Sequence, residues 1–217
     1  MSTFTRIFLN PYRRDAQRLL LNPQVMHAAV QAAFPPGYSP GKGRILWRVD
    51  RQKDQHTLYI VAPGKPDAQH IVEQAGWDTS CPDVADYDRF LLQLTKGQNW
   101  RFELVANPVV AKSQGKDGRG KLMRHVTPDQ QLEWLRKRSE NNGFVLLDDA
   151  TVIGSRRLRF HKRTGTNGRK VVIDTTRFAG TLRVENADAL RTNLVQGIGR
   201  AKAYGCGLLT LAPVAER

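Results

Sequence analysis

The sequence predicts an α+β protein made of two tandem ferredoxin-like (RRM-like) domains. Its strand-like and helix-like segments first follow the order β-α-β-β-α-β, which defines this arrangement, and a similar pattern begins again from Trp100. With 217 residues, 40% of them hydrophobic, the chain is long enough for two domains of about a hundred residues each. We expect the domains at residues 1–95 and 100–217, joined near residues 95–99.

The elements of the first domain are predicted from apolar runs bounded by proline, glycine and polar residues. Asn22-Pro23 is typical of a helix start, because asparagine caps the free backbone N–H groups and proline suits the first helical position. Pro35, Pro36 and Gly37 then end this helix. The expected helices cover residues 15–21, 23–34 and 66–75. The expected strands cover residues 3–9, 43–50, 57–62 and 89–94.

The second domain is expected to be looser and to carry insertions. Thr127-Pro128 predicts a helix start, and Gly143 predicts its C-terminal stop. Residues 112–121, glycine-rich and basic, predict a mobile loop. The expected helices cover residues 127–141 and 187–196. Besides a basic hairpin, the expected strands cover residues 101–106, 144–147, 179–185 and 208–211.

Charge is distributed unevenly and points to a polyanionic partner. Net charge is +14, with 12 Lys and Arg against 9 acids in residues 1–100, and 22 against 11 in the remainder. Such an excess indicates binding to nucleic acid, or to a membrane surface. The second alternative lacks support, because no stretch approaches 18 apolar residues and no basic amphipathic helix, lipidation signal or signal peptide is found. Cys81 and Cys206 lack metal-ligand spacing, so a reduced, cytoplasmic protein without structural zinc is expected.

A basic run at residues 156–170 is the strongest local sign of nucleic-acid binding. No acid occurs between Asp149 and Asp174, and Asn167-Gly168 favours a tight hairpin turn. We predict a cationic β-hairpin that contacts RNA; the alternative is a solvated, charge-rich loop. The candidate RNA-binding residues here are Arg156, Arg157, Arg159, His161, Lys162, Arg163, Arg169 and Lys170.

A glycine-rich segment between a predicted helix and the closing strand indicates an anion-binding loop. Glycine permits positive φ and close backbone approach, so a phosphate can lie against the main chain. The alternative is a simple turn from helix to strand. The candidate loop glycines are Gly197, Gly199, Gly205 and Gly207, and the candidate RNA-binding cations are Arg200 and Lys202.

One histidine is a candidate catalytic residue. On the helix from Pro23 the apolar residues form one stripe, and His27 lies on the other face near the helix start. An imidazole with a pKa near 7 can move a proton at neutral pH, as RNA transphosphorylation requires, although surface histidines are commonly inert. No metal-ligand constellation is visible, because the Asp148-Asp149 pair and the aspartates at residues 83–88 are typical of solvated loops. If the protein is an enzyme, a metal-free, cofactor-free mechanism is favoured.

Five motifs, in order over residues 3–213, resemble the CRISPR RNA-processing endoribonucleases of the type I-E Cascade complex, the CasE family. They are Asn-Pro-Gln-Val-Met-His (22–27), Arg-Ile-Leu-Trp-Arg (44–48), the basic run, Phe-Ala-Gly-Thr-Leu-Arg-Val-Glu (178–185) and Gly-Ile-Gly-Arg-Ala-Lys-Ala-Tyr-Gly-Cys-Gly-Leu-Leu (197–209). The resemblance implies that the protein binds the stem-loop of a CRISPR repeat, cuts once at the 3′ base of the stem, and stays on the guide RNA with other Cascade subunits.

The family's catalytic histidine falls on His27, and a tyrosine found in some members is replaced by Gln24, which cannot act as an acid or base. The products implied by this chemistry are a 2′,3′-cyclic phosphate and a 5′-hydroxyl, and their formation needs no divalent ion. Two alternatives remain open. One is a non-catalytic RNA-binding subunit of a ribonucleoprotein; the other is a DNA-binding regulator, for which no helix-turn-helix is visible.

Overall fold

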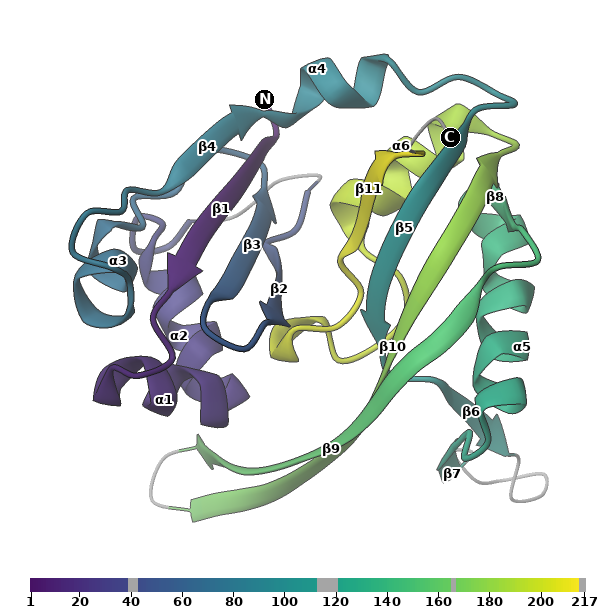
Figure 1. The fold of residues 1–217 in the computed structure, drawn as a ribbon. Coiled ribbons are helices and arrows are strands. Elements are labelled where there is room, and N and C mark those ends of the chain that lie inside the picture. The colour runs from purple at the N-terminus through teal and green to yellow at the C-terminus, as the bar shows by residue number, and fades with distance from the viewer. Residues whose placement is uncertain (39–42, 113–120, 165–166, 215–217) are drawn as a thin grey trace.

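The computed structural model describes residues 1–38, 43–112, 121–164 and 167–214. Two main antiparallel sheets stand side by side, with α1, α2 and α3 on the outer side of the first and α5 on the outer side of the second (Figure 1). A long hairpin, β9 and β10, extends from the second sheet toward α1 and α2. This arrangement confirms the predicted α+β class.

The first sheet has the strand order β2-β3-β1-β4. Together with two helices after β1 and one after β3, this order is that of a ferredoxin-like domain. Asn22 caps α2 as predicted, its side chain accepting a 3.0 Å hydrogen bond from the Gln24 backbone N–H. The strands are β1 (Thr3–Leu9), β2 (Leu46–Arg51), β3 (His56–Ala62) and β4 (Asp83–Asp86). The helices are α1 (Arg14–Leu21), α2 (Pro23–Ala32) and α3 (Gln69–Ala75).

The predicted strand at residues 89–94 is wrong. Those residues belong largely to the helix α4 (Tyr87–Leu92), and the edge strand of the sheet is instead β4, which pairs with β1. Asp86 caps α4 by accepting a hydrogen bond from the Asp88 backbone N–H. Tyr87, Leu91 and Leu94 are buried at helical spacing, so packing against the core decides the conformation of this apolar run.

The second sheet has the strand order β11-β5-β10-β8, with β9 also paired to β10. The predicted strand at residues 179–185 is the end of a much longer strand. Residues 113–120 of the predicted mobile loop lie outside the described residues, but its two ends belong to a β-ladder that the sequence did not indicate, β6 with β7. The strands are β5 (Asn99–Ala106), β6 (Val109–Lys112), β7 (Lys121–Arg124), β8 (Phe144–Leu146), β9 (Thr151–Thr164), β10 (Asn167–Val184) and β11 (Leu209–Pro213).

The helices of the second domain agree with the sequence prediction at their caps. Thr127 and Gln130 form a reciprocal capping box at the start of α5, and Gly143, with φ of 81°, follows the end of the helical segment. They are α5 (Pro128–Ser139), η1 (Glu140–Asn142), α6 (Ala187–Gln196) and η2 (Lys202–Tyr204), where η marks a short 3₁₀ helix.

A buried arginine on β2 joins the two domains. Arg48 is 2% exposed and donates two hydrogen bonds to the Asp50 carboxylate, at 2.8 and 2.7 Å. It also donates to the backbone carbonyls of Glu103 on β5 and Leu208 beside β11. These hydrogen bonds therefore link the edge strand of the first sheet to the second sheet.

Candidate active site and nucleic-acid interface

His27 lies where three elements meet. Met26 and Val30 are buried in the core of the first domain, so the helix turns His27 away from that core toward η2. Its ring lies 6.5 Å from that of Tyr204, edge to face, and Tyr204 in turn packs at 4.8 Å on Phe160 of β9. The predicted polar-face position is therefore correct, but the residue is half-buried rather than freely exposed.

The environment of His27 favours its neutral form. The pKa of His27 is lowered from its ordinary value, chiefly by burial and further by the positive charge of Lys162 on β9. Its Nδ1 atom is buried without a hydrogen-bond partner among the described residues. Because the ordinary pKa of histidine is about 6.5, a lowered value leaves the ring uncharged at neutral pH and able to accept a proton.

A small cationic pocket opens beside His27. Its volume is about 210 Å³, and its lining includes Gln31, Arg44 and Lys202 but no carboxylate. The pKa of Lys202 is lowered first by burial and then by the charge of Arg44, so two like charges are held close together. An anion entering the pocket would relieve their repulsion. Lys202 was a sequence candidate; Arg44 was not, because only the fold brings the segment before β2 next to η2.

The basic hairpin has two different faces. Directly paired residues of an antiparallel ladder point to the same side, and successive residues alternate. Arg156, Lys162 and Arg169 therefore share one face with the buried Phe160 and Ile173, the face toward the first domain. Arg157, Arg159, His161 and Lys170 lie on the other face and are exposed. The predicted β-hairpin is confirmed as a structure, whereas its contact with RNA stays a prediction. The Arg163 side chain and residues 165–166 of the turn lie outside what the structure describes.

One of the hairpin cations already has an acidic partner. Arg157 Nε lies 2.7 Å from Asp174 Oδ1, and Arg124 also binds that carboxylate, at 3.0 Å. Asp174 is 17 residues away in sequence but directly opposite Arg157 in the ladder. Arg159 and Lys170 form no ion pair within the described ranges, so they remain available to an external anion.

The glycine-rich loop adopts the predicted left-handed backbone, with φ of 73° at Gly197, 80° at Gly199, 79° at Gly205 and 91° at Gly207. Its glycines also allow close packing. A Cβ at Gly205 would lie 2.7 Å from the Trp47 ring, and one at Gly197 would lie 2.8 Å from Leu46. The absence of a side chain at these two positions therefore allows the loop to pack directly against β2.

The anion-binding role of the loop remains a prediction. Its cation Lys202 lines the pocket beside His27, whereas Arg200 is exposed and does not line that pocket.

Other candidate chemistries find no support in the described part of the chain. No three His, Cys, Asp or Glu side chains gather there as metal ligands. The acidic group has structural roles, with Asp83 paired to Arg6 at 2.7 Å and Asp86 capping α4. Cys206 is fully buried, which raises its pKa to about 12. Among the described helices, none has the length and apolar character needed to span a bilayer.

The fold and the site together define a class of protein: basic, with two ferredoxin-like domains, and with a histidine and unpaired cations where the domains meet. The family model described as "CRISPR associated protein" matches residues 4–213, and the chain belongs to this family.

Individual proteins similar to this chain show which members of the family it resembles. CRISPR-associated endoribonuclease Cse3 of Thermus thermophilus is 30% identical over 220 residues, covering 96% of this chain and 99% of that protein. The CRISPR system Cascade subunit CasE of Escherichia coli K12 is 32% identical over 177 residues, covering 77% of this chain and 85% of that protein. A solved structure of Cse3 bound to a 19-nucleotide RNA superposes with a TM-score of 0.81 at 28% identity, covering 98% of this chain and 99% of that one. The family expected from the motifs is thus confirmed, as are the tandem ferredoxin-like domains.

Proposed function

We propose that this protein is a CRISPR RNA-processing endoribonuclease. It binds the stem-loop of a CRISPR repeat, cuts the precursor at the 3′ base of the stem without a metal ion, and stays on the mature guide RNA as a cytoplasmic Cascade subunit. The observation that carries the proposal is the histidine kept neutral beside three cations, Lys162, Lys202 and Arg44. The names of the Cse3 and CasE relatives support the RNA-processing role.

In the proposed reaction the RNA supplies its own nucleophile. The 2′-hydroxyl before the scissile phosphate gives its proton to neutral His27 as its oxygen attacks phosphorus. The O2′–P bond forms, the P–O5′ bond breaks, and the leaving oxygen takes a proton from solvent. The products are a 2′,3′-cyclic phosphate and a 5′-hydroxyl. Because the lowered pKa disfavours protonated His27, we assign it the role of general base.

The nearby cations would stabilise the charge that develops on the phosphate. Fixed donors directed at a transition-state anion are commonly the largest contribution to such catalysis. Lys162 and Lys202 extend from the second domain, and Arg44 from the first, so the phosphate would be held between the two domains. Bringing these elements together also aligns the attacking and leaving oxygens.

The exposed face of the hairpin would bind the RNA stem. Duplex RNA is recognised mostly through its shape and backbone, because side chains cannot read its deep, narrow major groove. Arg159 and Lys170 are exposed on that face. Several such phosphate contacts would also hold the product after cleavage.

Cleavage of a labelled repeat RNA in EDTA tests the proposal. Wild-type protein is expected to cut once and to leave a 2′,3′-cyclic phosphate. An RNA with 2′-deoxyribose at the nucleotide before the cut should bind equally well and resist cleavage, because the nucleophile is missing. Normal cutting of this RNA, or loss of all cutting in EDTA, would show that water and a metal ion do the chemistry.

A further inference from the structure

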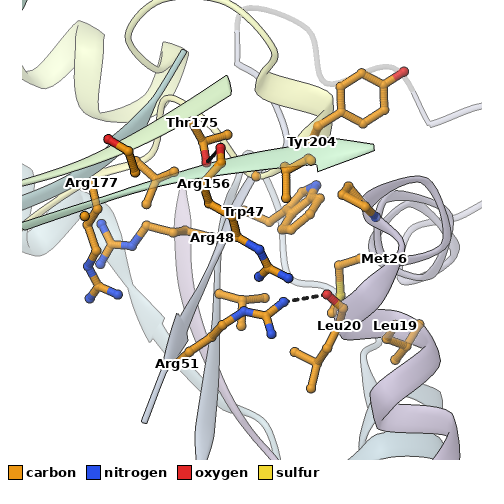
Figure 2. Close-up of a pocket in the computed structure, with 17 residues that line it drawn as sticks. Leu19, Leu20, Met26, Trp47, Arg48, Arg51, Arg156, Thr175, Arg177 and Tyr204 are labelled. Atoms are coloured by element: carbon orange, nitrogen blue, oxygen red, sulfur yellow. Dashed lines mark hydrogen bonds between the residues drawn. The ribbon is translucent and has the colours of Figure 1, made fainter. Parts of the chain in front are cut away.

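A larger pocket lies between the domains, next to the site just described (Figure 2). Its volume is about 270 Å³, close to the lower end of the roughly 300–1,000 Å³ typical of small-molecule sites. Its walls come from α1, α2 and β2 of the first domain and from β9, β10 and η2 of the second. Tyr204, whose ring contacts that of His27, is part of its lining. The pocket and the catalytic site therefore share one aromatic side chain.

The floor of this interdomain pocket is apolar and partly aromatic. Leu19, Leu20 and Met26 approach from the helices, Trp47 from β2 and Leu158 from β9. Such a floor accepts a flat apolar group.

Two arginines add positive charge to the pocket. Arg51 donates a hydrogen bond to the backbone carbonyl of Leu20 (Figure 2), and Arg156 comes from the hairpin. Burial first, and then the charge of Arg156, lower the pKa of Arg51 to about 10. Neither arginine has an ion pair in the described ranges. The other two arginines of the lining, Arg48 and Arg177, are already bound to carboxylates.

An apolar floor with unpaired guanidinium groups matches a nucleotide, because its base stacks on apolar or aromatic side chains and its phosphate pairs with arginine. Arg156 lies on the same face of β9 as Lys162, six residues away, or about 20 Å along the strand. An RNA strand leaving the catalytic site could therefore reach the pocket within a few nucleotides.

We propose that the interdomain pocket binds one unpaired nucleotide of the RNA that flanks the cut, with its base on the apolar floor and its phosphate between Arg51 and Arg156. This inference rests on the proposed function. It assigns the pocket a substrate role that neither His27 nor the outer face of the hairpin requires.

Fluorescent RNA tests the proposal. Repeat RNAs carry 2-aminopurine at one unpaired position at a time, on either side of the stem, and His27→Ala protein prevents cleavage during the measurement. Binding is expected to quench the fluorescence strongly at one position, since stacking quenches 2-aminopurine. Leu158→Trp, which fills the pocket, should abolish that quenching. Leu92→Trp adds the same side chain at an exposed position of α4, outside the pocket lining and the hairpin, and should leave the quenching intact.

A second variant and an abasic RNA keep the test decisive if Leu158→Trp folds poorly. Arg156→Gln should weaken the same quenching. Removing the base at the responsive position should weaken RNA binding to protein with an intact pocket by about 5–150-fold, the usual contribution of one stacked base. The same removal should weaken RNA binding to the Arg156→Gln protein by a smaller factor.

The proposal is wrong if no flanking position responds, or if both pocket variants respond as fully as the control. It is also wrong if the pocket variants bind RNA normally and instead lose the other Cascade subunits, because the pocket would then hold a protein segment. In each case, normal cleavage of the repeat by wild-type protein would leave the proposed function standing.

Discussion

Removing the unpaired cations on the outer face of the hairpin should flatten the salt dependence of RNA binding. The variant Arg159→Gln with Lys170→Gln loses two exposed charges that have no acidic partner in the described chain. Each lost phosphate contact is expected to reduce the slope of log K against log salt by about 0.7–0.9, or roughly 1.4–1.8 for the pair. If the double variant and wild type bind the RNA equally at 1 M salt, this difference in slope makes the variant bind about 20-fold more weakly than wild type at 0.15 M salt.

Arg157→Gln provides the matched control. Its charge is already balanced by Asp174 at 2.7 Å, so its removal should change the slope by clearly less than one phosphate contact. Filter binding of the repeat stem-loop at four or more salt concentrations measures all three proteins. If the double variant keeps the wild-type affinity and slope, the hairpin face is only a solvated surface and the RNA binds elsewhere.

Three further predictions concern stability, the loop and pH. Arg48→Ala should destabilise the protein by about 3–5 kcal/mol in urea unfolding, because its buried carboxylate partner loses its main ion pair; a loss under about 1 kcal/mol would show that the domains are joined otherwise. Gly205→Val should lower the melting temperature as well as RNA affinity, since its side chain meets the Trp47 ring at a backbone φ of 79°; weaker binding at unchanged stability would instead favour a direct phosphate contact at the loop. The midpoint of the decline in cleavage at low pH should lie below the ordinary histidine pKa of about 6.5, because burial and Lys162 lower the pKa of His27. Lys162→Met should move that decline to higher pH, and an unmoved profile would mean that the two groups are not coupled.

The sequence predicted those features that depend on local chemistry. Asn22 and Thr127 cap helices whatever surrounds them, so both helix starts were correct. Periodicity also placed His27 on the side of its helix away from the core. In contrast, the apolar pattern of the residues around Phe90 and Leu91 fits a strand and a helix equally well. The cap at Asp86 and contacts with the second domain decide it, and neither is visible in the run itself.

The rest of the site depends on contacts between distant segments. Arg44 reaches His27 only because β2 is the edge strand next to η2. The pairing of Arg157 with Asp174 follows from the register of a ladder whose exact alignment the turn sequence does not set. The interdomain pocket likewise exists only after the hairpin has packed against α1 and α2. Composition identified the partner class, but charge counting could not separate paired cations from free ones.

The most direct test of the central claim is the single-turnover cleavage rate of a labelled repeat RNA by His27→Ala protein. We predict a rate at least about a hundredfold below wild type, the usual contribution of one general base, with RNA affinity nearly unchanged. His125→Ala, at a histidine after β7 that does not line the pocket beside His27, is the matched control and should cut at close to the wild-type rate. A His27→Ala rate within about threefold of wild type would contradict the account, because the chemistry would then not depend on this histidine.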